Sequence, residues 1–463
     1  MDPNLVHNAD NKAEHMMRGT KRFLQITPML AVAGFLAMSA PAAHAAANDA
    51  ETYRQLDQLM DVFERVRAEY VEKVDDKKLL EGAINGMLAS LDPHSSFLDS
   101  RDFEQMRQQT EGEYGGLGIE VTQENGVVKV VSPIDETPAS RAGIKAGDYI
   151  THINKESIFG FSLQDAITKM KGPPKTSITL TIAREGEDKT RDIVLVRETI
   201  TLNRVRSEVK AGTIGYIRVS QFNKNVGAST RTAVSDLQQK IGDKKITGYV
   251  IDLRRNPGGL LDQAIEVSDV FLERGEIASQ RGRRKDDIQR YYARPGDQTN
   301  GKPIIVLVDE SSASASEIVA GALQDHRRAL VLGQRTFGKG SVQTLIPLSE
   351  DTALRLTTAR YYTPSGRSVQ ELGVQPDILV PQLSDPDLNT RPRLREADLR
   401  NHLINNKSGE SRTEEVDDKQ DPRFSATAEA LKKLKIDDFQ LDYAIKVLKR
   451  LEKTPAKVAS AAR

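Results

Sequence analysis

Residues 303–317 decide the fold of the central part of the chain. They read Pro303-Ile304-Ile305-Val306-Leu307-Val308-Asp309-Glu310-Ser311-Ser312-Ala313-Ser314-Ala315-Ser316-Glu317. The apolar, β-branched run predicts a buried strand, and the Ala- and Leu-containing segment 318–323 predicts a helix after it. A turn of small residues between them can display one hydroxyl beside the unpaired N–H groups of the helix. We therefore expect a nucleophile among Ser312, Ser314 and Ser316, which spacing alone does not separate.

A segment downstream supplies a candidate base. It reads Thr336-Phe337-Gly338-Lys339-Gly340-Ser341-Val342-Gln343 and carries one lysine between two glycines. Loss of solvation in such a small, partly apolar setting lowers the pKa of an amine. A neutral amine can take a proton from a serine, which is the Ser-Lys form of a nucleophile–base pair. These two segments together predict a serine protease.

Strands and helices alternate over residues 198–380, which predicts an α/β core with a mainly parallel sheet. Strands are expected at 215–219 and 249–253, and helices at 227–240 and 260–272. Asn256-Pro257-Gly258-Gly259 follows the second strand, at the sheet edge where ligands of such folds gather. Its backbone N–H groups could stabilise an oxyanion, although a plain strand–helix turn would explain the same residues.

Composition narrows the class of protein. The 463 residues suggest two to four domains, and Lys+Arg and Asp+Glu are both 66, so the formal charge is zero. This balance does not favour nucleic acid as a partner. The absence of cysteine excludes a thiol nucleophile and disulfides. The seven histidines are scattered, so we expect neither a metal nor another cofactor.

The N-terminus has the pattern of an export signal. Arg18, Lys21 and Arg22 precede the apolar run 26–38, which is followed by Ala43-His44-Ala45. A charged region, a hydrophobic region and a small-x-small site predict a signal peptide over residues 1–45, cut after Ala45. The apolar run is shorter than the roughly 20 residues that a membrane span needs. We expect a periplasmic protein, with or without membrane attachment. Residues 1–15 are polar and atypical of a signal, so either translation starts at Met16 or Met17 or these residues are an added extension.

Residues 46–106 are predicted to form an N-terminal helical domain. Apolar residues recur there at three- and four-residue steps, and the stripe suits a helical hairpin packed on its own domain as well as a subunit interface. A turn, Asp92-Pro93-His94-Ser95-Ser96, follows. No partner for His94 is marked nearby, so a surface or capping role is expected for it.

Residues 107–197 change to short strands and turns. The segments Gly116-Leu117-Gly118-Ile119 and Ala142-Gly143-Ile144-Lys145-Ala146-Gly147-Asp148 resemble those of a PDZ domain. PDZ domains add an extended peptide to a sheet edge and hold its terminal carboxylate with backbone N–H groups. The resemblance implies that this loop is formed by Gly115, Gly116, Leu117, Gly118 and Ile119.

Residues 381–463 are predicted to hold a linker and a C-terminal helical module. Ser408 to Asp421 is polar and charged, as in a flexible linker. Apolar residues then recur at helical spacing from Thr427 to Leu451, and either local packing or oligomerisation would use them.

The motifs together resemble those of the carboxyl-terminal processing (tail-specific) serine proteases. Ser-Ala-Ser-Ala-Ser-Glu-Ile, Thr-Phe-Gly-Lys-Gly-Ser-Val-Gln and Asp-Leu-Arg-x-Asn-Pro-Gly-Gly match, and the likeness covers residues 57–380. It implies Ser314 as nucleophile, Lys339 as general base and Gln343 as the residue that orients the lysine. It also implies an oxyanion hole from the backbone of Ala315 and of the Gly258–Gly259 pair, with Gly259 favoured.

The expected fold is therefore multidomain α/β, with a PDZ-like domain between an N-terminal helical segment and the protease core. The expected function is an envelope endopeptidase that cleaves proteins near their C-termini, with the PDZ unit binding the tail and gating the site. Expected partners are protein or peptide C-termini, a second copy of the chain and an activating adaptor protein. The alternatives are a catalytically silent PDZ scaffold, a small-ester hydrolase, and a triad using Asp325 and His326, which adjacent helical positions disfavour.

Overall fold

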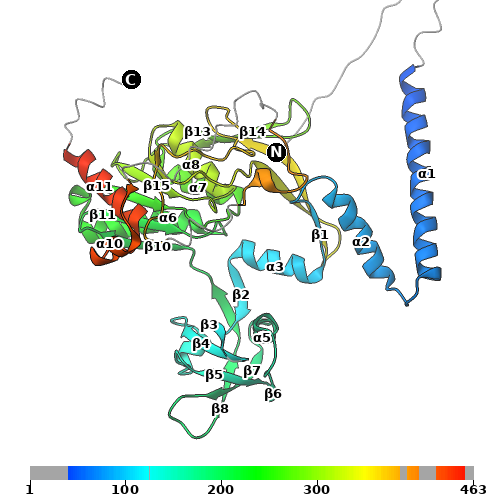
Figure 1. Cartoon of the computed structure of the whole chain (residues 1–463), viewed down its shortest axis with the longest axis horizontal. Coiled ribbons are helices and arrows are strands. Elements are labelled where there is room, and N and C mark those ends of the chain that lie inside the picture. Colours follow the sequence, from blue (N-terminus) through cyan, green and yellow to red (C-terminus); the bar gives the residue numbers. More distant parts are fainter. Residues whose placement is uncertain (1–39, 125, 386–393, 406–423, 454–463) are drawn as a thin grey trace, which may run out of the picture. The chain divides into compact units, whose positions relative to one another are not determined.

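The computed structural model describes residues 40–124, 126–385, 394–405 and 424–453, and Figure 1 labels its elements. The chain divides into two compact units, residues 1–80 and 81–463. Most of the predicted signal peptide, the predicted linker 408–421 and the tail 454–463 lie outside the described residues. None of the helices in the described ranges has both the length and the apolar character needed to cross a bilayer.

The first unit contains one long helix, α1 (Ala40–Glu69), and the start of α2 (Asp76–Ala89). Large apolar side chains of α1 are at least half exposed, among them Leu56, Leu59, Met60 and Val62. The helical pattern predicted from the sequence is present in α1.

A six-stranded sheet forms the centre of the second unit, in the order β10-β11-β12-β15-β16-β19. The pair β10–β11 is antiparallel, and the remaining neighbours are parallel. Every residue of β12 and β15 is buried, as expected for parallel strands covered on both faces. The strand bounds are β10 (Val205–Lys210), β11 (Ile214–Val219), β12 (Gly248–Asp252), β15 (Ile304–Val308), β16 (Leu330–Gly333) and β19 (Ile378–Leu379).

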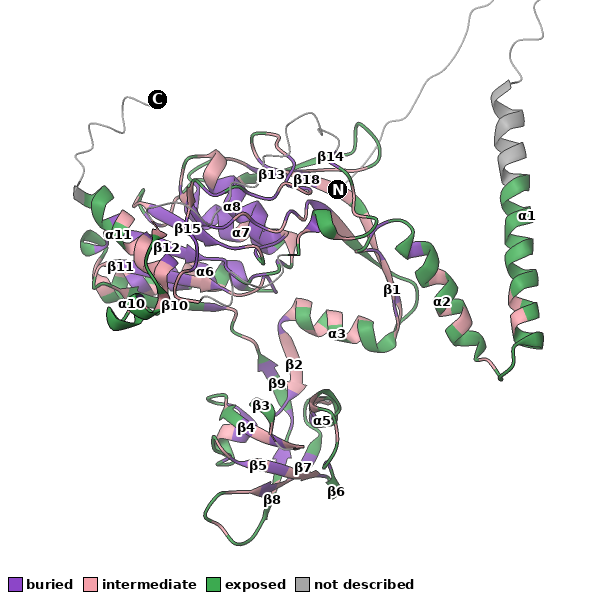
Figure 2. Ribbon diagram, in the orientation of Figure 1, coloured by how far each residue is buried: buried purple, intermediate pink, exposed green. Residues whose placement is uncertain are grey.

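Helices cover both faces of this sheet. One face packs against α6 (Val226–Ile241), α7 (Leu261–Phe271) and α8 (Ala315–Asp325). On the other face, Ala444 and Leu448 of α11 (Phe439–Lys453) are fully buried against β11, β12 and β15. Figure 2 shows the buried residues concentrated in β15, α7 and α8. The C-terminal helical module predicted from the sequence thus completes the core; it also contains α10 (Ala428–Lys433).

A second, antiparallel sheet carries the segment after Lys339. Its order is β1-β18-β13-β14, and β17 also pairs with β18. Its strands β13 and β14 form an antiparallel hairpin. The bounds are β1 (Ser96–Leu98), β13 (Gly275–Arg281), β14 (Ile288–Ala293), β17 (Ser341–Pro347) and β18 (Ala353–Tyr362), with short 3-10 turns η1 (Asp243–Lys245) and η2 (Glu396–Asp398) elsewhere.

The PDZ-like region is a sheet of its own, β3-β4-β5-β7-β8, with β6 paired to β5. Its core is separate from that of the α/β sheet. The strands were expected from about residue 107, but helix α3 (Ser100–Glu111) continues to Glu111, where Gly112 ends it in the left-handed conformation. The bounds are β2 (Glu113–Gly116), β3 (Ile119–Glu124), β4 (Val127–Pro133), α4 (Pro138–Arg141), β5 (Tyr149–Ile153), β6 (Glu156–Ser157), α5 (Leu163–Met170), β7 (Ser177–Ala183), β8 (Arg191–Val196) and β9 (Glu198–Thr201), which pairs with β2.

Candidate active site

Ser314 occupies the sharp turn between β15 and α8. It is the N-cap of α8 and has φ 54° and ψ −112°. A positive φ is uncommon for a residue other than glycine, and such strain collects at functional sites. The turn places Ser314 at the N-terminus of α8, where the positive end of the helix dipole stabilises developing negative charge.

The three candidate serines differ in what their hydroxyls do. Ser312 is fully buried and its Oγ donates to the Leu253 carbonyl at 2.9 Å. Ser316 is also fully buried and its Oγ donates to the Asn256 carbonyl at 2.9 Å. Ser314 is half-buried and lines a cavity of about 370 Å³. The geometry therefore favours Ser314 as the nucleophile, because two of the three hydroxyls are engaged in holding the turn.

Lys339 lines the same cavity, on the loop before β17. Gly338 beside it has φ 99°, and a Cβ there would lie 3.0 Å from the Glu371 backbone, so the loop can pass this closely only as glycine. Burial lowers the pKa of Lys339 to about 8, against the influence of nearby carboxylates such as Glu396. Its Nζ donates to the Gln343 Oε1, so the structure brings the predicted lysine and glutamine together.

The Ser314 hydroxyl and the Lys339 amine share the cavity without bonding directly. Among the described residues no hydrogen bond joins them, and the amine is held by Gln343 instead. In a free enzyme catalytic hydrogen bonds are often long and tighten only when substrate is bound. Ser314 and Lys339 therefore line one cavity, as the predicted dyad requires.

Two residues that the sequence analysis missed connect the serine to the lysine. The fully buried Glu317 carboxylate accepts hydrogen bonds from the backbone N–H of Ser314 at 2.8 Å and of Lys339 at 2.9 Å. The buried Tyr361 hydroxyl lies within hydrogen-bonding distance of the carbonyl oxygens of the same two residues. Burial raises the pKa of Glu317 to about 7, and the hydrogen bonds it accepts oppose that rise. The signal for Glu317 was present, because Ser-x-x-Glu is a capping box.

The predicted oxyanion donors are only partly available. The N–H of Gly258 donates to the Asn256 Oδ1 at 2.9 Å. Within the described ranges, the N–H groups of Ala315 and Gly259 have no hydrogen-bond partner, and both residues line the cavity. Gly258 instead permits close packing, since a Cβ on it would lie 2.8 Å from the Ser314 Cβ. The geometry thus favours Gly259 and Ala315 as donors.

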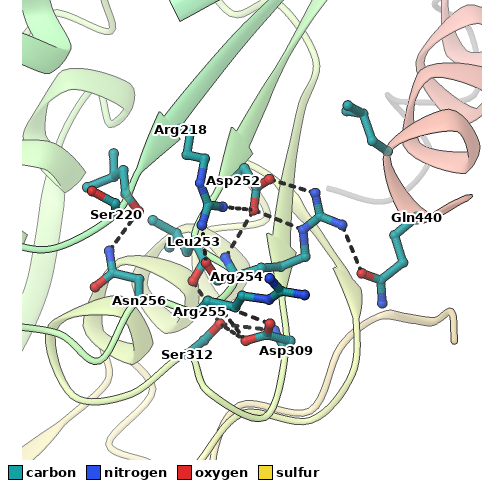
Figure 3. A network of polar contacts seen from close by, with 12 residues as sticks. Arg218, Ser220, Asp252, Leu253, Arg254, Arg255, Asn256, Asp309, Ser312 and Gln440 are labelled. Carbon is teal, nitrogen blue, oxygen red and sulfur yellow. Dashed lines mark hydrogen bonds and ion pairs between the residues drawn. The ribbon is translucent and has the colours of Figure 1, made fainter. Parts of the chain in front are cut away.

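A polar network fixes the loop that carries these glycines (Figure 3). Arg254 bonds to Asp252 through Nε at 3.0 Å and Nη2 at 2.6 Å, and to Gln440 of α11 through Nη1 at 3.1 Å. Arg218 adds an ion pair to Asp252 at 3.1 Å. Asn256 donates from Nδ2 to the Val219 carbonyl at 2.8 Å. The loop is thereby tied to two strands and to the C-terminal helix.

Comparison with known proteins places these features in a family. The model named peptidase family S41 matches residues 213–380, the PDZ domain model residues 115–195, and the "Activating protease CtpB N-terminal domain" model residues 29–102. A carboxy-terminal-processing protease of Bartonella bacilliformis is 52% identical over 403 residues, 87% of this chain and 90% of the relative. The chain belongs to the carboxy-terminal processing proteases. It is a serine peptidase of family S41 with a PDZ domain.

More distant relatives also match this chain. The protease is 36% identical to CtpB of Bacillus subtilis, over 72% of this chain and 69% of the relative. It is 34% identical to CtpA of the same organism, over 70% of this chain and 68% of the relative. Among solved structures, a photosystem II D1 C-terminal processing protease matches at 30% identity with a TM-score of 0.42. The match covers 71% of this chain and 94% of that structure's chain.

The PDZ domain of the protease has a small apolar pocket at the predicted loop. Gly116, Leu117, Gly118 and Ile119 line this cavity of about 80 Å³, with Ile167 and Met170 of α5 opposite. Gly115 lies outside this cavity and pairs with Thr199 in the β2–β9 ribbon. The N–H groups of Leu117 and Gly118 make no hydrogen bond among the described residues. The pocket thus offers free donors next to an apolar cavity.

Asp325 and His326, the candidate triad partners, are engaged elsewhere in the described part of the chain. His326 follows α8 and bonds through Nε2 to the Glu276 carbonyl at 2.7 Å, and the Asp325 carboxylate accepts from Arg367 at 3.0 Å. The expectation for His94 was wrong, since its Nε2 bonds to the buried Glu396 at 2.8 Å. That partner lies 302 residues further along the chain, so no local signal could reveal it. In the described part of the chain, no cluster of three His, Asp or Glu side chains is arranged to hold a metal ion.

Proposed function

We propose that the protease cleaves its substrates with a Ser314–Lys339 dyad. The observation that carries this proposal is the shared cavity, which both Ser314 and a lysine of lowered pKa line. With a pKa near 8, roughly a tenth of the amine is neutral at pH 7, against about one part in 3,000 for an ordinary lysine.

The chemistry follows from these positions. The neutral Lys339 Nζ takes the hydroxyl proton as the Ser314 Oγ attacks the substrate carbonyl. The N–H groups of Ala315 and Gly259 stabilise the oxyanion, and losing one such donor typically costs ~2.7–4 kcal/mol in the barrier. The lysine ammonium then protonates the leaving amine, an acyl-enzyme forms, and water activated by the same lysine hydrolyses it. Gln343 holds one N–H of the amine so that the lone pair can face the serine.

Substitution of the two residues tests the dyad. Ser314→Ala and Lys339→Ala should each reduce the cleavage of casein to background, because one removes the nucleophile and the other its base. Ser311→Ala is the matched control, since Ser311 is exposed on the same turn and does not line the cavity. Full activity in either dyad variant, with the melting temperature unchanged, would refute the assignment.

We also propose that the PDZ pocket docks the C-terminus of the substrate and that docking completes the active site. The free N–H groups of Leu117 and Gly118 suit a carboxylate, and the missing Ser314–Lys339 hydrogen bond suits a site that is finished only on binding. A peptide with an apolar C-terminus, added in trans, should accelerate cleavage of a substrate that lacks such a tail. Leu117→Asp should abolish the acceleration, whereas Val194→Asp, on an exposed position of β8, should not. If the peptide has no effect, the gating proposal fails.

Export to the periplasm and self-association complete the proposal. The charged, apolar and small-residue segments of 1–45 support a signal peptide, and the exposed stripe of α1 supports contact with a second copy of the chain. The intact mass of the mature protein should correspond to a start at Ala46. An activating adaptor protein is a further proposed partner. A silent scaffold is disfavoured, because it would need neither the strained Ser314 nor a buried lysine.

A further inference from the structure

The turn Asp92–Ser95 lies far upstream of the catalytic segments in the sequence, but its hydrogen bonds connect it to residues around Lys339. The buried Asp92 carboxylate accepts from the N–H of His94 at 2.8 Å and of Ser95 at 2.9 Å, and from the Ser95 Oγ at 2.7 Å. Three hydrogen bonds to one carboxylate make the turn rigid. The strand that follows it, β1, pairs with β18 from Ser96↔Arg355 to Leu98↔Ala353.

The Ser95 side chain reaches Lys339 through two intermediates. Its Oγ accepts the N–H of Thr357 in β18 at 3.1 Å. The Thr357 Oγ1 in turn accepts from the Gln343 Nε2 at 3.1 Å. Because the amide nitrogen is held there and by the Ser341 Oγ, the amide oxygen faces the lysine. Ser95 therefore fixes the strand position on which the orientation of the Gln343 amide depends.

His94 holds two charged groups that act on the lysine with opposite signs. Its backbone carbonyl accepts from the Arg355 Nε at 3.0 Å, and its ring bonds to Glu396 at 2.8 Å. The Glu396 carboxylate is fixed from the other side by the Gln370 Nε2 at 3.0 Å. Glu396 raises the pKa of Lys339 and Arg355 lowers it; the other charges that act on it are Glu317 of α8 and Asp92 of the turn itself.

We propose that the Asp92–Ser95 turn is a positioning element for Lys339, acting through Thr357 and Gln343 on the direction of its amine and through Arg355 and Glu396 on its charge. The inference rests on the proposed Ser314–Lys339 dyad. It gives the N-terminal part of the second unit an indirect role in catalysis, because none of these residues touches the substrate's reacting atoms in the proposed mechanism.

The first test removes one hydroxyl. Ser95→Ala should lower kcat by about 10- to 100-fold with KM unchanged, because a small displacement of a catalytic group has a large kinetic effect. Ser96→Ala is the matched control, since the buried Ser96 Oγ has no hydrogen-bond partner among the residues that the structure describes, and it should keep the wild-type kcat. Ser95→Thr restores the hydroxyl and should recover most of the activity. A Ser95→Ala variant with the kcat of Ser96→Ala would overturn the proposal.

The second test changes one charge and keeps the shape. Glu396→Gln removes a negative charge that favours the ammonium form, so the rising limb of kcat/KM against pH should move to lower pH. A merely structural role would lower activity at every pH without moving the limb, and that result would also overturn the proposal. Ser314→Ala separates the two hypotheses. If Ser314→Ala remains active, the proposed dyad fails. If Ser314→Ala is inactive while the turn variants match wild type, the dyad stands and the turn proposal fails.

Discussion

At the scale of single residues, the proposed mechanism depends on the Lys339 amine being neutral often enough to accept a proton. Burial and the positive charge of Arg355 disfavour the ammonium form of Lys339 and lower its pKa. The carboxylates of Glu396 and Glu317 favour the ammonium form and raise the pKa. The balance leaves the pKa near 8 rather than lower. Gln343 holds the lysine amine in that environment, and the Glu371 backbone packs against the neighbouring Gly338.

The lowered pKa of Lys339 predicts the pH dependence of activity. Below about pH 8 the amine is mostly protonated and cannot accept the serine proton, so kcat/KM should rise about tenfold per pH unit up to that point and then level off. Initial rates of casein cleavage between pH 6 and 9.5 measure this limb. A profile already flat from pH 6 would show that the base is not this lysine.

At the scale of elements, the site is assembled where two loops meet the N-terminus of α8. The loop 254–259 is tied to β11 and α11, and the loop 336–340 is tied to α8 through Glu317. In each loop, one position lies so close to neighbouring atoms that only glycine fits there. The distance between nucleophile and oxyanion donors is therefore set by backbone packing rather than by flexible side chains.

Gly258 is the sharpest test of that packing. Gly258→Ala should lower kcat by about 100-fold, because the new Cβ would lie 2.7 Å from the Ala313 carbonyl and 2.8 Å from the Ser314 Cβ and would displace the nucleophile. Gly212→Ala is the control, since Gly212 also has a positive φ of 78° but no atom within 4 Å of the added carbon. Equal kcat in the two variants, measured on folded protein, would contradict the packing argument.

At the scale of the whole molecule, segments distant in sequence complete the catalytic core. The turn at residues 92–95 reaches the lysine, and helix α11 covers the second face of the sheet that carries Ser314. The ion pairs of Arg254 with Asp252 and Asp438 join that helix to the loop before the oxyanion donors. The C-terminal module is therefore expected to stabilise the active site as well as the fold.

Asp438 tests this connection. Burial alone would raise its pKa, but hydrogen bonds from Arg254 lower it to about 2, so the pair contributes stability that is present above pH 3.8 and is lost as the pH falls through about 2. Asp438→Asn should lower the free energy of unfolding by about 1–3 kcal/mol at pH 7. Asp437→Asn, an exposed neighbour, is the control. Coincident urea unfolding curves for the two variants would rule out the connection.

Local sequence was enough to predict the PDZ and α/β folds, and the family match confirms both. Fully apolar strands, helical periodicity and glycine-rich turns are set by interactions between near neighbours, so 304–308 and 249–253 could be read directly as strands. The candidate nucleophile and base were likewise marked by their local motifs, though only resemblance selected Ser314 over Ser312 and Ser316. Their catalytic roles remain predictions.

The tertiary structure alone decided which groups are free and which are engaged. It showed that Ser312 and Ser316 hold the turn, that the Gly258 N–H is occupied, and that His94 meets Glu396. These contacts join residues up to 302 positions apart. They arise from how whole elements pack against one another, and no local pattern encodes that. The sequence therefore determined the chemistry that is present, and the packing determined which atoms can take part in it.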